Sequence, residues 1–183
     1  SPKILWGEGL FLRPQHFQQQ DAYHEGRLAQ MARLLHPYAW GIRQLKVDTD
    51  ALQTGVLRIT ELQAVLPDGE LFNAPAEDEL PPPVALSSLA QDGQDAGSWV
   101  FHLALAPTRS HGTNMAASLE EADTAVRYYR VPLPTPDAFT DAVSAEVMVL
   151  RKSAKLLPEQ APRAHLISLP LLRVKRTSTG GFE

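Results

Sequence analysis

The chain of 183 residues contains no cysteine. This absence excludes disulfides, thiolate metal sites and cysteine nucleophiles, and it is typical of a protein that works in a reducing cytoplasm. No apolar run approaches the ~20 residues that a membrane-spanning helix requires, and the opening residues lack the apolar centre of a signal peptide. We therefore expect a soluble domain that is not inserted in a membrane.

The chain also has no excess of positive charge. Its formal net charge is -4 with both signs mixed, so it offers no broad basic field for a nucleic acid. The basic residues of the last third are interpreted as solvated strand ends, with a small basic patch as the alternative. They are Arg151, Lys152, Lys155, Arg173, Lys175 and Arg176. We expect no nucleic-acid partner.

Motifs for catalysis, metal binding or cofactor binding are missing as well. The sequence has no glycine-rich phosphate loop, zinc-protease helix, nucleophile elbow or EF-hand loop. Ser110 and His111 are sequence neighbours that would point apart on an extended chain. His16 and His24 lie two helical turns apart, too far to share one ion. We predict no catalytic residue, metal or cofactor, and hence a protein that is not an enzyme.

One helix is well marked. It is predicted over residues 14–36, because Pro14 suits a first helical turn and Pro37 prevents continuation. An apolar stripe runs along it, formed by Phe17, His24, Leu28, Met31 and Leu35. We expect the stripe to pack on the domain's own sheet, with an interface with another protein as the alternative.

The rest of the chain predicts a mostly β fold. Fifteen prolines argue against a helical bundle, and short alternating segments indicate antiparallel strands. A hairpin is expected at Pro67–Gly69, a bulge within 56–66, a central strand at 99–105, and an edge or bulge at Pro170. The predicted strands cover 42–52, 56–66, 71–72, 99–105, 124–133, 145–157 and 165–177, and the loops 74–86, 91–98 and 109–121.

Two sheets packed face to face would bury the apolar side chains on one face of each strand. The predicted organisation is therefore a leader at 1–13, the helix at 14–36 packed on the sandwich, an antiparallel β-sandwich at 37–177 and a flexible tail at 178–183.

The segment Leu5–Gln20 identifies a family. It combines glycines, large apolar residues and a glutamine tract: LWGEGLFLRPQHFQQQ. No generic structural element requires this mixture, and an exposed leader of this kind would be costly unless folded protein covered it. The segment resembles the opening of the TssK family, the baseplate adaptors of the bacterial type VI secretion system.

The resemblance implies a three-part protein, with an N-terminal β-sandwich shoulder like that of phage receptor-binding proteins, a helical neck and a head. The shoulder would attach to the baseplate wedge proteins TssF and TssG. The full-length protein would be a cytoplasmic trimer at the inner face of the inner membrane, and its head would contact TssJ, TssL and TssM. This chain matches the shoulder, and we expect the neck and head to be missing from it.

Candidate interaction residues come from the family segment. They are Leu5, Trp6, Glu8, Gly9, Phe11, Leu12, Pro14, Gln15, His16 and Phe17. Trp6, Phe11 and Leu12 either contribute to baseplate attachment or clamp the helix to the sandwich. A second functional hypothesis is a glycan- or receptor-binding sandwich that uses Trp99, Tyr128 and Tyr129 as stacking platforms.

Overall fold

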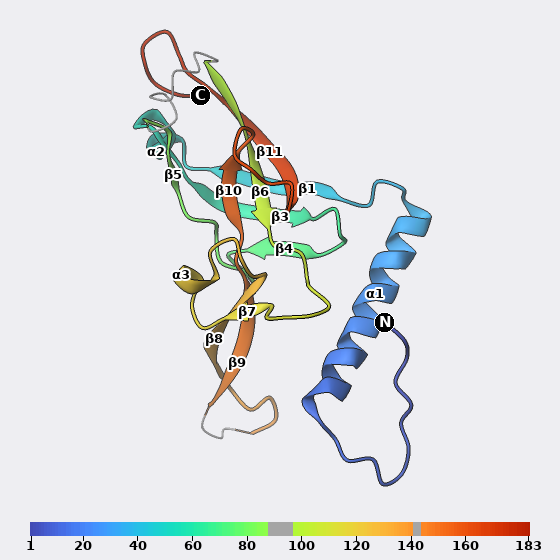
Figure 1. Cartoon of the computed structure of the whole chain (residues 1–183). Coiled ribbons are helices and arrows are strands. Elements are labelled where there is room, and N and C mark those ends of the chain that lie inside the picture. The colour runs from blue at the N-terminus through green and yellow to red at the C-terminus, as the bar shows by residue number, and fades with distance from the viewer. Residues whose placement is uncertain (88–96, 141–143) are drawn as a thin grey trace.

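A computed structural model describes residues 1–87, 97–140 and 144–183 (Figure 1). The predicted loop at 91–98 lies largely outside these residues. The helices are α1 (Pro14–Leu35), α2 (Thr49–Gln53) and α3 (Leu119–Ala122). The strands are β1 (Gly41–Val47), β2 (Val56–Leu57), β3 (Ile59–Val65), β4 (Leu71–Ala74), β5 (Val84–Ala85), β6 (Ser98–Leu105), β7 (Met115–Ala116), β8 (Tyr128–Thr135), β9 (Ala145–Lys152), β10 (Lys155–Pro158) and β11 (Ile167–Lys175).

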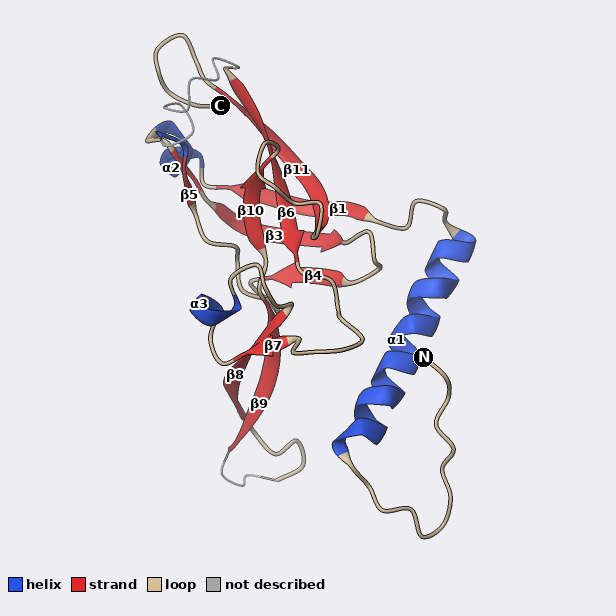
Figure 2. Cartoon of the chain, in the orientation of Figure 1, coloured by secondary structure: helices blue, strands red, loops and turns tan. Residues whose placement is uncertain are grey.

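Two three-stranded antiparallel sheets form the body, in the orders β1-β3-β4 and β10-β6-β11. Their inner faces share one core, to which β3 contributes Leu62 and β6 contributes Phe101 and Leu103, all three fully buried. The mostly β fold with antiparallel sheets and one long N-terminal helix is therefore confirmed (Figure 2).

The β3–β4 hairpin and its bulge follow the sequence prediction. Gly69 has a φ of 93°, which a glycine adopts without strain, and Leu71 and Phe72 pair with Val65 and Ala64. Lys46 pairs with Glu61 but the next residue of β1 pairs with Ile59, so Thr60 is the extra residue of a bulge. The bulge explains why the buried positions change from odd to even numbers between Ile59 and Leu62.

The central strand is also confirmed, since β6 lies between β10 and β11. Pro170 lies on the edge strand β11, next to a register shift between residues 170 and 172. Both of the predicted settings for this proline, an edge and a bulge, thus occur together.

Three expectations at the ends of elements are wrong. The predicted strand 42–52 ends at Val47, because Asp48 caps the short helix α2 through a hydrogen bond from the Ala51 amide to Asp48 Oδ1. The segment 145–157 is two strands, β9 and β10, which belong to different sheets. Residues 182–183 are not a free tail, because the Lys175 and Glu183 backbones exchange hydrogen bonds of 2.7 and 2.9 Å.

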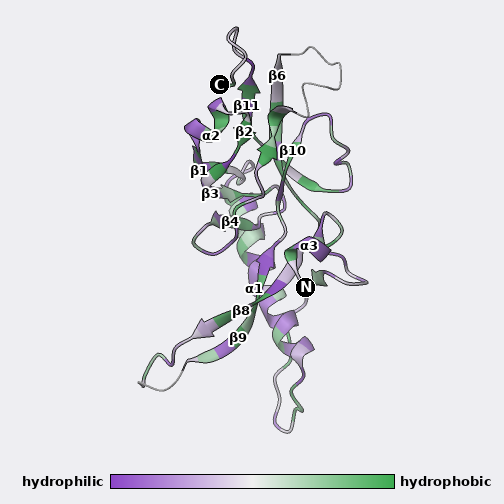
Figure 3. Ribbon diagram, turned by 90° about the vertical axis from the view of Figure 1, so that its left-hand side faces the viewer, coloured by the Kyte–Doolittle hydropathy of each residue, from purple (hydrophilic) through white to green (hydrophobic). Residues whose placement is uncertain are grey.

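A third sheet, β7-β8-β9, extends the molecule beyond the body. Strands β8 and β9 pair from Tyr128↔Lys152 to Thr135↔Ala145, and together they are called the ribbon below. The ribbon projects away from the two body sheets in both views (Figures 1 and 3). A two-stranded ribbon is only marginally stable by itself, so its attachment to the body needs a physical cause.

Candidate protein interface

The leader and α1 form a single extension, here called the apolar arm (residues 1–35). The leader turns at Gly7–Leu10, where Gly9 has a φ of 78°, and then enters α1 in extended conformation. It is fastened to the first turns of α1 by a hydrogen bond of 2.9 Å from Gln19 Nε2 to the Pro2 carbonyl. The rings of Trp6 and His16 lie 6.3 Å apart. Trp6 thus lies beside the first turns of α1.

The start of α1 uses an unusual cap. Pro14 occupies the first helical turn, as predicted, and His16 Nδ1 accepts a hydrogen bond of 3.0 Å from the Arg13 amide. His16 is half-buried in this contact, whereas Glu8, Gly9, Pro14 and Gln15 are exposed. The two histidines of α1 share no site, since His24 lies instead against Tyr23.

Large apolar side chains of the arm face solvent. Leu5 is 89% exposed, Trp6 47%, Phe11 80%, Leu12 52% and Phe17 53%. Exposure of this many large apolar groups in one segment is characteristic of a surface that another protein covers. The sandwich of this chain does not cover the leader.

The packing predicted for the α1 stripe is wrong. Leu28 is 73% exposed, Met31 57% and Leu35 69%, and no residue of α1 is buried. The helix stands beside the sandwich (Figure 1) and approaches it at the β3–β4 turn, where Arg33 Nη2 donates to the Pro67 carbonyl at 3.2 Å. Residue 69 must be glycine there, because a Cβ would lie 2.9 Å from Ala29 Cβ.

A groove remains between α1 and the body. Its volume is about 720 Å³, and its apolar lining includes Leu28 and Ala32 of the helix and Val65 and Leu71 of the sheet. The helix thus contacts the body at one turn and leaves most of its apolar stripe free. The exposure of the stripe favours the alternative stated above, in which the stripe contacts another protein.

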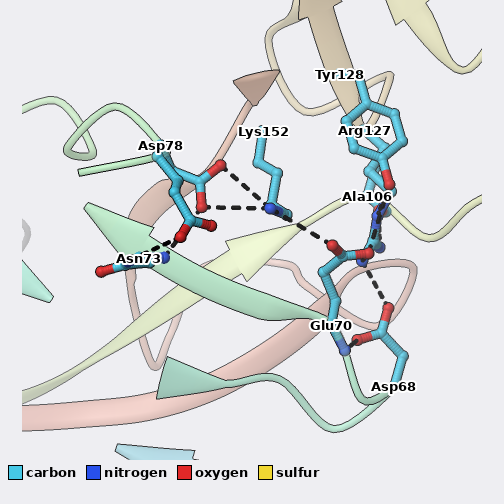
Figure 4. Close-up of polar contacts among 9 residues, drawn as sticks. Asp68, Glu70, Asn73, Asp78, Ala106, Arg127, Tyr128 and Lys152 are labelled. Carbon is cyan, nitrogen blue, oxygen red and sulfur yellow. Dashed lines mark hydrogen bonds and ion pairs between the residues drawn. The ribbon is translucent and has the colours of Figure 1, made fainter. Parts of the chain in front are cut away.

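A network of charged residues ties the ribbon to the sandwich (Figure 4). Arg127, just before β8, is 1% exposed, and it donates to Asp68 at 2.8 Å, to Glu70 at 3.2 Å and to the Ala106 carbonyl at 2.9 Å. On β9, Lys152 lies 3.2 Å from Asp78 and 3.4 Å from Glu70. Buried charges require such partners, and here they fix the base of the projecting ribbon.

The electrostatics of this network keep Arg127 charged. Burial by itself would lower the pKa of Arg127, but Asp68, Tyr128 and Glu70 outweigh burial and raise the pKa. Burial and the neighbouring Glu70 raise the pKa of Tyr128 above its ordinary value. Sequence reasoning missed this network, because its members come from positions far apart in the chain. The one signal was an arginine, Arg127, directly before a strand that begins with two tyrosines.

Contacts within the chain hold three of the six side chains of the basic patch considered above. Arg151 donates to the Glu77 carbonyl at 2.8 Å, Lys152 is paired as described, and Lys155 pairs with Asp123. These side chains are held by carboxylates and carbonyls of this chain, which argues against a free basic surface.

The proposed glycan platforms are not available either. Trp99 is 5% and Tyr129 3% exposed, and the Tyr128 hydroxyl belongs to the charged network, with Arg127 Nε at 3.2 Å. A stacking platform needs an open aromatic face. The glycan interpretation therefore loses the residues on which it depended.

His102 is the clearest unexplained polar side chain. It lies on β6, is 8% exposed, and neither ring nitrogen has a hydrogen-bond partner among the described residues. Burial, followed by the positive charge of Arg163, lowers the pKa of His102, and Glu159 opposes this effect. Because its pKa is lowered on folding, we expect His102 to make the stability of the fold depend on pH.

The described residues contain neither a cluster of metal-binding side chains nor a membrane-spanning helix. No group of three or more histidine, aspartate or glutamate side chains there could hold a metal ion. No helix in that part of the chain is long and apolar enough to cross a membrane.

A closed sandwich that carries an uncovered apolar arm and a projecting ribbon has the architecture of a protein-interaction domain. The family follows from comparison: residues 16–183 match the model described as "Bacterial Type VI secretion, VC_A0110, EvfL, ImpJ, VasE". The chain belongs to this family, the TssK family of type VI secretion baseplate proteins, as the resemblance of Leu5–Gln20 predicted.

A curated relative supports this assignment. The type VI secretion system baseplate component TssK1 of Pseudomonas aeruginosa PAO1 is 39% identical over 126 residues, which are 69% of this chain and 27% of the relative. The matched segment therefore spans about a quarter of that relative's length.

Solved structures agree on the fold. A chain in a cryo-electron microscopy structure of the type VI TssK-TssF-TssG baseplate subcomplex superposes with a TM-score of 0.90 at 27% identity, covering all of this chain and 59% of that one. A crystal structure of TssK gives a TM-score of 0.81 at 24% identity, covering all of this chain and 40% of that one. The second likeness concerns the fold alone.

Proposed function

We propose that this chain is the shoulder of a TssK-type baseplate adaptor and that its apolar arm attaches the adaptor to the TssF–TssG wedge. The role is structural: the chain holds a partner and catalyses no reaction. The likeness to a chain from a TssK-TssF-TssG subcomplex supports the choice of partner. The candidate contacts are those of the family segment, with Trp6, Phe11 and Leu12 at the centre.

One observation carries this proposal, the exposure of the arm. Phe11 is 80% exposed and Trp6 47%, although the chain has a closed core that could have buried them. Aromatic side chains that are exposed in the free protein and buried in the complex are typical interface anchors. The α1 stripe, with Leu28 and Met31, extends this surface along the helix.

The remaining parts of the proposal depend on the family resemblance. The full-length protein would trimerise, and its head would contact TssJ, TssL and TssM of the membrane complex. The adaptor would then work in the cytoplasm, at the inner face of the inner membrane. In this arrangement the shoulder supplies the baseplate half of the bridge.

The test uses the chain and a purified TssF–TssG complex. Affinity is measured by biolayer interferometry for the wild type and for a Trp6→Ala/Phe11→Ala double variant, with co-migration on size exclusion as a second readout. Loss of two aromatic anchors is expected to weaken binding by about 10- to 100-fold.

The matched control is Ile42→Ala, which removes an apolar side chain of 38% exposure on β1, outside the arm and the ribbon, and is expected to bind like the wild type. Thermal unfolding of all three proteins checks that the fold is intact. Equal affinities of the double variant and the wild type would remove the arm from the interface. Failure of the wild type to bind TssF–TssG would contradict the proposed function itself.

A further inference from the structure

Among the described residues no strand pairs with the outer edge of β9, and the pairing with β8 fixes the direction of its backbone groups. Ser153 donates its amide to the Arg127 carbonyl at 2.9 Å, one step beyond the Tyr128↔Lys152 pair. Residues 127 and 153 are therefore a hydrogen-bonded pair, and such pairs alternate along an antiparallel ladder. Val131↔Val149 and Leu133↔Val147 are then hydrogen-bonded, whereas the amides of the residues between them point away from β8.

The outward residues are Glu146, Met148 and Leu150. An independent observation agrees, because Met148 and Glu146 lie opposite Pro132 and Pro134, which have no amide hydrogen to give to β9. Each outward residue presents one N–H and one C=O on the free edge, and successive outward residues lie about 7 Å apart along the strand. This repeat is complementary to the backbone of another extended polypeptide.

Four other strand edges among the described residues are interrupted, those of β8, β4, β11 and β1. Edge strands are normally blocked by prolines, bulges or covering loops, because a free edge invites another strand. Strand β8 has Pro132 and Pro134. On β4, the Asn73 carbonyl accepts from the amides of residues 77 and 78, and the Asn73 amide donates to Asp78 Oδ2 at 3.0 Å.

The edges of β11 and β1 are interrupted too. Strand β11 contains Pro170 and exchanges backbone hydrogen bonds between Lys175 and Glu183. Strand β1 has a register shift between Ile42 and Gln44. None of these devices occurs in the eight residues of β9, where residues 145–150 include one charged side chain, that of Glu146.

The side chains of β9 favour an apolar partner. Val147 (44% exposed) lies on one face of the ribbon, and Met148 (52%) and Leu150 (55%) lie on the other. An incoming strand with apolar residues would extend both faces and cover these groups, while its backbone satisfied the free edge.

We propose that the β9 edge binds an extended apolar segment of the TssF–TssG wedge as a fourth strand of the sheet β7-β8-β9. This inference rests on the proposed function. The choice of the wedge follows from position, because the ribbon and the leader extend toward the same end of the molecule in both views (Figures 1 and 3). One partner at that end can contact both.

The decisive variant is Met148→Pro. It removes an outward amide and places a ring in the path of an added strand, while the ladder to β8 loses no hydrogen bond. Met148→Ala removes the same side chain and keeps the amide. With purified TssF–TssG as the probe, we expect Met148→Pro to weaken binding by at least about tenfold and Met148→Ala by less than about threefold.

Two controls keep the result interpretable. Val149→Pro, one residue further, removes an amide that bonds to β8, so it should lower the thermal midpoint more than Met148→Pro does. Amide hydrogen exchange of the wild type, measured residue by residue, should slow at Glu146, Met148 and Leu150 by about tenfold or more when TssF–TssG is added.

The possible failures are distinguishable. Wedge binding without slower exchange at these three amides, or with full affinity of Met148→Pro, would overturn the added strand but leave the proposed function intact. Self-association that Met148→Pro abolishes, with wedge binding unchanged, would overturn it in favour of a second copy as the occupant. A wild-type chain that does not bind TssF–TssG would overturn both.

Discussion

The sandwich and the apolar arm use the same kinds of residue in opposite ways. Trp99 and Phe101 of β6 are 5% and 0% exposed, whereas Trp6 and Phe11 of the arm are 47% and 80% exposed. In the sandwich, two sheets cover each other's apolar rows, and the fold is complete within the chain. In the arm, the described residues of this chain leave the large apolar groups exposed. The comparison separates apolar residues that stabilise the fold from apolar residues that the fold leaves exposed.

The largest effect is expected in the core. Phe101→Ala leaves a cavity between the two sheets, because this side chain is fully buried. It should lower the free energy of unfolding by about 3–5 kcal/mol, measured by urea denaturation. A loss below about 1 kcal/mol would show that the two sheets are not packed as described.

A smaller but still large effect is expected at the base of the ribbon. Arg127→Met leaves Asp68 and Glu70 without their buried partner, and both carboxylates are 30% exposed, so water offsets part of the loss. We expect about 2–3 kcal/mol lower stability. Lys46→Met is the matched control, because Lys46 is 62% exposed in its pair with Glu61 and should cost about 0–1 kcal/mol. Equal effects of the two variants would contradict the structural role of the network.

His102 makes the stability of the sandwich dependent on pH. Its pKa is lowered from 6.5 in the folded chain, mainly by burial, so the unfolded chain binds a proton first as the pH falls. Stability is therefore unaffected above pH 6.5 and decreases below it, until the folded pKa is reached, by at most about 1.4 kcal/mol per pH unit. The difference in unfolding free energy between the wild type and His102→Leu should change in this direction between pH 7 and 5. A difference that is constant with pH would show that His102 protonates equally in both states.

The smallest effect on stability is expected in the arm. Phe11→Ala should change the free energy of unfolding by less than about 0.5 kcal/mol, because the side chain contacts little of its own chain. The same change should weaken binding to TssF–TssG. A destabilisation comparable to that of Phe101→Ala would place Phe11 in the core and remove the distinction between the two regions.

Much of the sandwich follows from local sequence patterns. The turn Pro67–Gly69, the alternation in 99–105 and the change of buried positions after Ile59 each specify a feature that depends on few neighbouring residues. Helix α1 was predictable for the same reason, since prolines at 14 and 37 set its limits. The family segment at Leu5–Gln20 supplied the assignment that no single pattern could.

Apart from the short helix α2, which a local cap at Asp48 begins, the main errors concern long-range contacts. An apolar stripe on a helix predicts that something covers it, but the stripe does not specify whether the cover belongs to the same chain. For α1, the described residues of this chain leave the stripe exposed. Likewise, Arg127 hydrogen-bonds to Asp68 and Glu70, which lie 59 and 57 positions away from it in the sequence. The ring centroids of Trp99 and Phe182 lie 6.2 Å apart, although nothing near Phe182 in the sequence predicts this contact. Such contacts depend on the complete topology.

The most direct test of the account is oxidative footprinting of side chains in the free chain and in its complex with TssF–TssG. Trp6, Phe11 and Phe17 should react readily in the free chain and become protected in the complex, while Trp99 and Phe101 should remain unreactive in both. Unchanged reactivity of the three arm residues in a complex that forms would contradict the claim that the arm is the attachment surface.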